Sequence, residues 1–411
     1  RITQKLKEGW QPYGSALIST AGYGAEFIQP VVSEGSISSP EEPGNRPTTS
    51  APSVAPEYYY VIALAGQSNG MSYGEGLPLP DTFDSPDPRI KQLARRSTVT
   101  PGGAACIYND IIPADHCLHD VEDMTGLNHP KADLSKGQYG CVGQGLHIAK
   151  KLLPFIPANA GILLVPCCRG GSAFTTGTDG TYSDTTGASE SSTRWGVGRP
   201  LYKDLIGRTK AALAKNPKNV LLAVVWMQGE FDFNGTPANH AARFTEVVDQ
   251  YRADLADMAG QCVGGSADSV PWICGDTTYF WKQKNETAYQ TVYGSYKNKT
   301  EKNIHFVPFM TDENGVNVPT NKPEEDPDIP DIGYYGSKWR TDRSTWTSQD
   351  RASHFSSWAR RGIISDRLAT AILSCAGKSS AFVNGTAGVV VPDRPVTTSE
   401  SVIFYDAKKA S

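Results

Sequence analysis

Short continuous runs of apolar residues recur along the middle of the chain and alternate with segments of helical period. Five such runs predict strands, at residues 58–65, 161–166, 219–226, 270–274 and 304–308. An apolar run without polar alternation is typical of a strand that is covered on both faces. These runs therefore predict the interior strands of a parallel sheet.

Amphipathic helices are predicted between and after the strands, at residues 142–153, 199–215, 238–259 and 356–375. In the third of these, apolar residues recur mostly at spacings of three and four, which places them along one stripe of a helix. Strands and helices that alternate in this way predict an α/β fold, with a doubly wound parallel sheet flanked by helices.

Two long stretches interrupt the alternation. Residues 71–140 separate the first strand from the next clear helix, and residues 172–197 are rich in Gly, Ser and Thr. Connections of this length are often lids or binding walls. We therefore expect both stretches near a functional site.

The flanking regions suggest how the chain divides into domains. Residues 1–32 hold aromatic and apolar residues around turn signals, too few for an independent core, and predict a small β-rich appendage. Residues 33–56, rich in Pro, Ser, Gly and acidic residues, predict a linker. The α/β domain is expected to span residues 57–378. Residues 379–411 are interpreted as a C-terminal extension that could lead into a further β domain.

Composition argues against two classes of protein. The 411 residues have a formal net charge of −4, so the chain offers no basic field for nucleic acid. No run of about eighteen apolar residues occurs, so no membrane insertion is expected. The chain begins at Arg1 rather than Met, which suggests a processed product, and we expect a secreted or periplasmic protein.

The eight cysteines include no Cys-x-x-Cys pair and do not resemble a zinc ribbon. Cys106 and Cys117 lie in a loop-like region and could form a disulfide, with buried free thiols as the equal alternative. His116 and His119 flank Cys117, but further ligands at zinc-like spacing are missing. We predict no metal site.

The end of the first strand carries the strongest candidate for chemistry. Residues 66–69, Gly-Gln-Ser-Asn, follow the buried strand at its carboxyl end, where open α/β sheets gather their ligands. Gly66 would allow a sharp turn, and Ser68 could begin a helix with its own N–H aimed at an oxyanion. We interpret Ser68 as a nucleophile. The alternative is an ordinary helix N-cap.

The next two strands end in residues that could complete a site for acyl transfer. After the second strand, the adjacent Gly170 and Gly171 would expose backbone N–H groups. After the third, Gln228 could supply a side-chain N–H. A serine nucleophile needs such donors for the oxyanion, and it also needs a base.

Seven histidines could supply the base. His147 and His240 fall inside predicted helices and His305 inside a strand, so we interpret these three as structural. His129 lies in a loop without further signals. His354 follows a polar loop and precedes the last helix, which would place it beside the end of the first strand. We predict that His354 is the base.

Four segments together resemble the ordered sequence blocks of the SGNH hydrolase superfamily: residues 66–69, 169–172, 226–232 and 354–355. Within this superfamily the chain is most similar to the branch of sialate O-acetylesterases and acetylxylan esterases. The N-terminal segment resembles a small domain of unknown function that precedes the esterase in prophage-encoded members of the NanS type. Those members also carry a C-terminal carbohydrate-binding domain.

The resemblance covers about residues 57–375. It implies a serine esterase that removes O-acetyl groups, chiefly the 9-O-acetyl, from N-acetylneuraminic acid through an acetyl-enzyme, without a metal or an organic cofactor. It implies that Ser68 is the nucleophile and His354 the general base. The implied oxyanion hole consists of the Ser68 N–H and the N–H of one or both of Gly170 and Gly171, with Gln228 as a further donor.

One position departs from the superfamily pattern. The acid that usually lies three residues before the histidine is replaced by Arg351. Asp350 could orient His354 through an altered turn, or a backbone carbonyl could hold the imidazole tautomer in a dyad. Glu230 is the other candidate carboxylate, and its alternative role is to orient Gln228 or a helix N-terminus.

Sialic acid carries a carboxylate, for which an arginine fork is a suitable partner. Arg169 and Arg351 adjoin the expected site, and Arg194 and Arg199 lie beside the 172–197 stretch. The predicted substrate-binding residues are Gln67, Asn69, Arg169, Glu230 and Arg351.

Two alternative functions remain open. The same chemistry would serve an acetylxylan esterase or another polysaccharide O-acetylesterase. A non-catalytic glycan-binding protein on an esterase scaffold is the alternative from another class.

Overall fold

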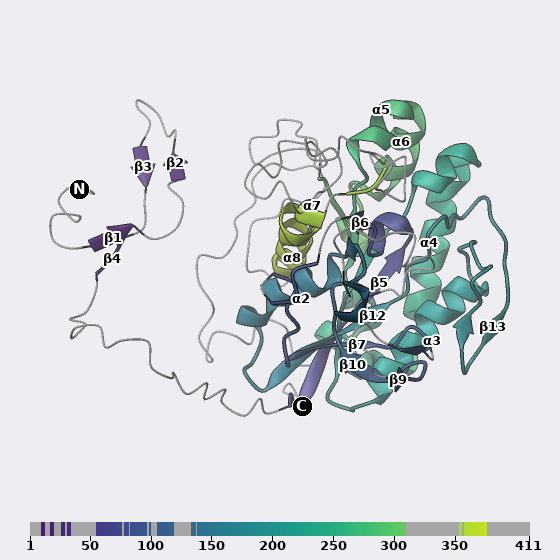
Figure 1. Ribbon diagram of the computed structural model, residues 1–411. Coiled ribbons are helices and arrows are strands. Elements are labelled where there is room, and N and C mark those ends of the chain that lie inside the picture. Colours follow the sequence, from purple (N-terminus) through teal and green to yellow (C-terminus); the bar gives the residue numbers. More distant parts are fainter. Residues whose placement is uncertain are drawn as a thin grey trace. The chain divides into compact units, whose positions relative to one another are not determined.

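The computed structural model describes four short N-terminal segments and most of the region from residue 55 to residue 375 (Figure 1). The described N-terminal segments are residues 10–12, 17–19, 26–28 and 31–33. The rest comprises residues 55–309, except 76–77, 82, 97, 100–104, 119–132 and 137, and residues 353–375, except 356. The chain divides into two units, Arg1–Ser53 and Val54–Ser411.

The first unit contains two antiparallel strand pairs. β1 (Trp10–Pro12) pairs with β4 (Val31–Ser33), and β2 (Leu17–Ser19) pairs with β3 (Glu26–Ile28). These strands agree with the predicted β-rich appendage. The predicted C-terminal extension and most of the predicted linker lie outside the described residues.

A seven-stranded sheet forms the centre of the second unit, in the order β10-β7-β12-β5-β15-β16-β17. Neighbouring strands are parallel except β10, which runs antiparallel to β7. The strands are β5 (Tyr58–Gly66), β7 (Ile90–Leu93), β10 (Ile111–Pro113), β12 (Ala160–Pro166), β15 (Val220–Met227), β16 (Trp272–Gly275) and β17 (Ile304–Val307). The predicted α/β fold is confirmed, with an antiparallel edge strand added.

Helices cover both faces of the sheet, and each face has its own core (Figure 1). Alternate residues of β5, such as Val61 and Ala63, pack with α3 (Pro200–Ala214) and α4 (Pro237–Asp254). The residues between them, such as Ile62, pack in the core that includes residues of α2 and α8. Both faces of β5 are therefore buried, which explains its unbroken apolar run. α2 spans Gly145–Leu152 and α8 spans Ile363–Cys375.

Two helix predictions were too long. The helix expected at residues 238–259 ends at Asp254 and is followed by the 3-10 helix Ala256–Gln261. The helix expected at residues 356–375 is divided into α7 (Ser357–Arg361) and α8. The apolar spacing continues through both interruptions, so periodicity alone does not locate them.

The 71–140 stretch was predicted as an insertion between strand and helix, but it contributes two strands of the sheet, β7 and the edge strand β10. Half-buried Lys91 and buried, polar Gln92 interrupt the apolar pattern of β7. Such a short strand with a polar centre does not stand out as an apolar run.

The described cysteines are free thiols. The suggested bridge between Cys106 and Cys117 is not formed, because the Cys117 sulfur lies 3.3 Å from that of Cys141, and the Cys106 thiol donates to the Arg96 carbonyl. The alternative of buried free thiols therefore holds for these residues.

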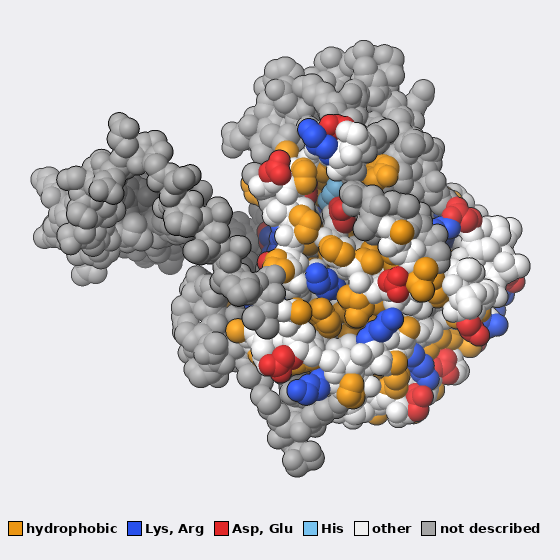
Figure 2. All heavy atoms as spheres, turned by 60° about the horizontal axis from the view of Figure 1, so that its bottom comes forward, with side chains coloured by type: hydrophobic (Ala, Val, Ile, Leu, Met, Phe, Trp, Pro, Cys, Tyr) orange, Lys and Arg blue, Asp and Glu red, His pale blue; other side chains and the backbone are white. Residues whose placement is uncertain are grey.

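The molecular surface agrees with the small net charge. On the face drawn in Figure 2, basic and acidic side chains of the described residues are interspersed. Within the described part of the chain, no helix is both long and apolar enough to cross a membrane.

Candidate active site

Gly66 turns the chain sharply at the end of β5. Its φ is 131°, and a Cβ atom there would lie 2.1 Å from the Met227 carbonyl oxygen on β15. No side chain fits, so the turn requires glycine. The Gln67 N–H donates to the same carbonyl at 2.8 Å. Ser68 then begins a 3-10 helix, Ser68–Gly70, with 9% of its surface exposed.

The loop after β12 lies against this turn. The Gly66 carbonyl accepts hydrogen bonds from the Arg169 N–H at 3.0 Å and from the Ser172 hydroxyl at 3.2 Å. Because β12, β5 and β15 are neighbouring parallel strands, their carboxyl ends meet at one edge of the sheet. The glycine pair that follows Arg169 therefore lies beside the turn that carries Ser68.

Three backbone N–H groups at this edge have no partner among the residues that the structure describes. Those of Ser68, Gly170 and Gly171 donate to no acceptor within the described residues. Backbone donors of this kind can stabilise the oxyanion of a tetrahedral intermediate.

Asn69 holds the backbone on both sides of His354. Its Nδ2 donates to the Ser353 carbonyl at 3.0 Å, and its Oδ1 accepts from the Phe355 N–H at 3.3 Å. Asn69 directly follows Ser68. The two hydrogen bonds therefore bring the turn that carries the imidazole to the turn that carries the serine hydroxyl, although the two are far apart in sequence.

The imidazole of His354 is half-buried. The ring of Tyr73 stacks on it at a centroid distance of 5.1 Å and an interplanar angle of 17°. Its Nδ1 lies 3.2 Å from the Ser353 hydroxyl. Burial lowers the pKa of His354 to about 3, and the positive charge of Arg360 acts in the same direction. The ring is therefore neutral near pH 7 and can accept a proton.

Arg360, in α7, is buried and forms hydrogen bonds with the same two segments. Its Nη1 donates to the carbonyls of Asn69 and Met71 at 3.0 and 2.8 Å and also to the Gln144 side chain, and its Nε donates to the Phe355 carbonyl at 3.4 Å. The guanidinium is completely buried, which lowers the pKa of Arg360 to about 9.

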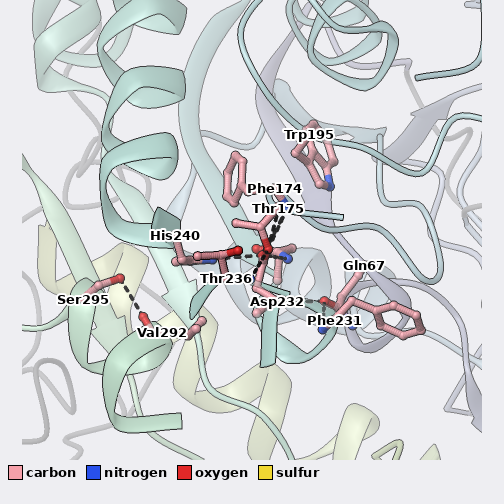
Figure 3. A network of polar contacts seen from close by, with 12 residues as sticks. Gln67, Phe174, Thr175, Trp195, Phe231, Asp232, Thr236, His240, Val292 and Ser295 are labelled. Carbon is pink, nitrogen blue, oxygen red and sulfur yellow. Dashed lines mark hydrogen bonds and ion pairs between the residues drawn. The ribbon is translucent and has the colours of Figure 1, made fainter. Parts of the chain in front are cut away.

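A second polar cluster surrounds Asp232, which lies in the 3-10 helix Glu230–Asn234 after β15 (Figure 3). The carboxylate accepts from the Gln228 amide at 2.7 Å, His240 Nδ1 at 3.0 Å and the N–H groups of Phe174 and Thr175 at 3.1 and 2.8 Å. Burial alone would raise its pKa, but these hydrogen bonds and the charge on His240 outweigh burial and hold the pKa of Asp232 at about 2. The cluster joins α4 to the loop after β12.

Gln228 is held through its side-chain amide nitrogen and through its backbone carbonyl. Its amide nitrogen donates to Asp232 and, at 3.3 Å, to the Ser172 carbonyl. Its backbone carbonyl accepts from the Tyr296 hydroxyl at 2.7 Å, and that hydroxyl also meets His240 Nε2 at 2.7 Å. Both amide hydrogens therefore already have acceptors. To reach an oxyanion, the side chain would have to release one of them.

Comparisons with known proteins agree with this geometry. A family of carbohydrate esterases, described as sialic acid-specific acetylesterases, matches residues 59–308. A probable 9-O-acetyl-N-acetylneuraminic acid deacetylase of Escherichia coli strain K12 is 55% identical over 321 residues, which cover 78% of this chain and 97% of the relative. The chain belongs to the sialic acid-specific acetylesterase family.

The fold and the N-terminal segment also have matches. The crystal structure of NanS is 55% identical to this esterase, with a TM-score of 0.70 over 78% of this chain and 98% of that chain. A domain of unknown function, DUF1737, matches residues 1–34. The resemblance stated from the sequence is confirmed, and the prophage origin that it implied stays a prediction.

Three residues of the esterase that were predicted to bind substrate are buried and bonded to protein: Gln67, Asn69 and Glu230. The Gln67 Oε1 accepts from the Gly229 N–H at 3.1 Å. Asn69 Nδ2 and the Thr277 hydroxyl donate to the same oxygen of Glu230 at 2.8 and 2.7 Å. Burial raises the pKa of Glu230. In this structure these side chains position the loops of the site.

Of the arginines considered as partners of the sialate carboxylate, Arg169 and Arg199 bond to protein groups. Arg169 donates to the Glu190 carbonyl at 3.1 Å and to the Gly170 carbonyl at 2.9 Å, which anchors the 172–197 stretch to the site. Arg199 pairs with Asp179. Arg351, and the candidate acid Asp350, lie outside the described residues.

Two positioning residues escaped the sequence analysis. Trp281, in the short helix α5 (Tyr279–Lys284), donates from its indole to the Ser353 carbonyl at 3.0 Å. Arg360 lies in a predicted helix without any signal that separates it from Arg361. A six-residue helix such as α5 is too short to show a period, and a helical period does not show which arginine of a helix bonds to a distant turn, so neither residue could be linked to His354 from sequence.

No group of three or more His, Cys, Asp or Glu residues that could hold a metal occurs within the ranges described above. The histidines interpreted as structural have protein partners. His147 Nε2 meets the Asp84 carboxylate at 2.9 Å, and His305 Nε2 meets the Asn303 side chain at 2.8 Å.

Proposed function

We propose that this protein hydrolyses O-acetyl esters of N-acetylneuraminic acid, chiefly the 9-O-acetyl ester, through an acetyl-enzyme formed on Ser68. The observation that carries the proposal is the pair of hydrogen bonds by which Asn69, next to Ser68, holds both neighbours of His354. The substrate is proposed from the Escherichia coli relative, whose name specifies 9-O-acetyl-N-acetylneuraminic acid.

In the proposed first step, neutral His354 accepts the Ser68 proton while the hydroxyl oxygen attacks the acetyl carbonyl. The negative charge that develops on the carbonyl oxygen is stabilised by the N–H groups of Ser68, Gly170 and Gly171. The protonated His354 then donates its proton to the sugar oxygen of the ester as the C–O bond breaks, and the sugar leaves as a free hydroxyl. This step leaves the acetyl group on Ser68.

In the second step, His354 removes a proton from a water molecule that attacks the acetyl-enzyme, and acetate leaves with Ser68 restored. Gln228 can add a fourth donor if it exchanges the Ser172 carbonyl, the more distant of its two acceptors at 3.3 Å, for the oxyanion. Asp350 is our proposed acid for orienting His354, and a dyad oriented by a backbone group is the alternative.

Acetate release from defined mono-O-acetylated sialic acids and from acetylxylan tests the proposal. We expect the 9-O-acetyl ester of N-acetylneuraminic acid to be the preferred substrate, and Ser68→Ala to abolish turnover with the fold intact. Ser183→Ala, in the hairpin strand β13 (Tyr182–Ser183), is the matched control and should keep full activity. A clear preference for acetylxylan, or an active Ser68→Ala variant, would contradict the proposal.

A further inference from the structure

The adjacent glycines beside the nucleophile lie between two aromatic side chains. A Cβ atom on Gly170 would lie 3.4 Å from the Tyr73 hydroxyl oxygen, and one on Gly171 would lie 3.6 Å from the ring of Phe231. These are ordinary contact distances. Tyr73, which stacks on His354, therefore lies close to Gly170, and Phe231 lies close to Gly171.

Phe231 is far more exposed than the nucleophile and than its own neighbours in the chain. Ser68 is 9% exposed and Phe231 is 42% exposed, whereas the neighbours of Phe231, Glu230 and Asp232, are 1% and 0% exposed. In Figure 3 the ring of Phe231 points away from the cluster around Asp232. A large apolar side chain thus faces solvent from a segment whose adjacent residues are buried.

The ring of Phe231 is nevertheless held in place by its backbone. The Gln67 Oε1 accepts from the N–H groups of Gly229 and Phe231 at 3.1 and 3.4 Å. The next residue, Asp232, is fixed by the hydrogen bonds described above. A ring that is positioned before the substrate arrives loses little conformational freedom on binding.

We propose that Phe231 is a substrate-binding residue whose ring packs against the C–H groups of the sugar that bears the acetyl ester. This inference rests on the proposed function and deepens it. The acetyl group has only two carbons, and its carbonyl must reach the buried Ser68. The sugar must therefore extend from Ser68 towards the exposed rim of the site, where the Phe231 ring lies beside Gly171. Aromatic side chains commonly line such sites because they offer apolar surface with few rotatable bonds.

The experiment compares two acetyl esters that differ in their leaving groups. Acetate release is measured with 9-O-acetyl-N-acetylneuraminic acid and with vinyl acetate, whose leaving group is too small to reach the rim. For Phe231→Ala we expect about a tenfold loss of kcat/KM on the sugar ester, mainly through a higher KM, and little change on vinyl acetate. Phe231→Tyr should retain activity on both esters because it keeps the ring.

Phe83→Ala is the matched control, since Phe83 is also an exposed phenylalanine, at 53%, and lies in the 71–140 stretch. It should change neither reaction. An equal loss on both esters with Phe231→Ala, or no loss on the sugar ester, would overturn the role of Phe231. If the unmodified protein hydrolyses vinyl acetate but not the sugar ester, the proposed function itself fails and this inference fails with it.

Discussion

Asn69 uses both side-chain hydrogens and its side-chain oxygen for positioning. The amide donates to Glu230 and to the Ser353 carbonyl, and the oxygen accepts from the Phe355 N–H. No acid three residues before His354 orients the ring in this chain. The two hydrogen bonds from Asn69 to the backbone of Ser353 and Phe355, here called the Asn69 bracket, are therefore a main constraint on where the imidazole lies.

Asn69→Ala is expected to lower kcat by about a hundredfold, because a displacement of a catalytic group by about 1 Å has an effect of that size. KM should change little, because Asn69 is 1% exposed and does not face the substrate. Steady-state kinetics on 9-O-acetyl-N-acetylneuraminic acid measures both constants. Asn216→Ala, which removes a hydrogen bond to the Glu57 carbonyl away from the site, is the control. A wild-type kcat in the Asn69→Ala variant would show that the Asn69 bracket does not position His354 for catalysis.

The lowered pKa of His354, about 3, predicts the acid side of the pH profile. A general base must be unprotonated, so activity is present above the pKa of His354 and is lost as the pH falls through it. We expect kcat/KM to stay nearly constant from pH 8 to about pH 5 and to decline only below that range. Circular dichroism at each pH separates unfolding from titration. A midpoint near the ordinary histidine pKa of 6.5 would contradict this prediction.

At the scale of elements, the pair formed by Asp232 and His240 joins α4 to the loops after β12 and β15. Both side chains are completely buried, and Asp232 Oδ2 lies 3.0 Å from His240 Nδ1. Removing one member of such a pair leaves a buried charge without its partner, which is strongly destabilising.

His240→Asn is expected to lower the free energy of unfolding by about 3 kcal/mol. Chemical denaturation followed by circular dichroism measures the change. His305→Asn is the matched control, because His305 is half-buried and bonds only to the nearby Asn303 side chain, and it should cost less than about 1 kcal/mol. Equal losses of unfolding free energy in the two variants would show that the pair of Asp232 and His240 stabilises the fold no more than the contact of His305 does.

At the scale of the whole molecule, the last helices are tied to the first strand of the sheet through Arg360. Its guanidinium reaches the turn after β5, the start of α2 and the segment that carries His354. The completion of the site therefore depends on α7 docking onto elements that precede it by more than 200 residues.

Arg360→Leu is expected to reduce the free energy of unfolding by about 3 kcal/mol, because several carbonyl groups lose a charged donor. It should also reduce kcat, since the Asn69 and Phe355 backbones lose a common partner. Arg243→Leu, which removes an exposed ion pair with Glu246 on α4, should change stability by less than about 1 kcal/mol. Denaturation and kinetics of both variants check this prediction. An unchanged free energy of unfolding and an unchanged kcat in Arg360→Leu would contradict it.

The sequence alone determined five of the seven strands of the sheet, the alternation with helices and the positions of Ser68, Gly170 and Gly171 at strand ends. These features are local: an unbroken apolar run reports burial of both faces, and a glycine after a strand reports a tight turn. The order of blocks that ends at His354 was sufficient to indicate a serine esterase.

Only the tertiary structure decided what surrounds these groups. The bracket of Asn69, the contacts of Arg360 and Trp281, and the cluster of Asp232 with His240 join residues from separate strands and helices. Hydrogen bonds of this kind depend on distances and directions between elements, which neither periodicity nor a motif specifies. The strands β7 and β10 were missed for a related reason: both are short, and β7 carries polar residues. They become strands because β7 pairs with β12 and β10 in turn pairs with β7.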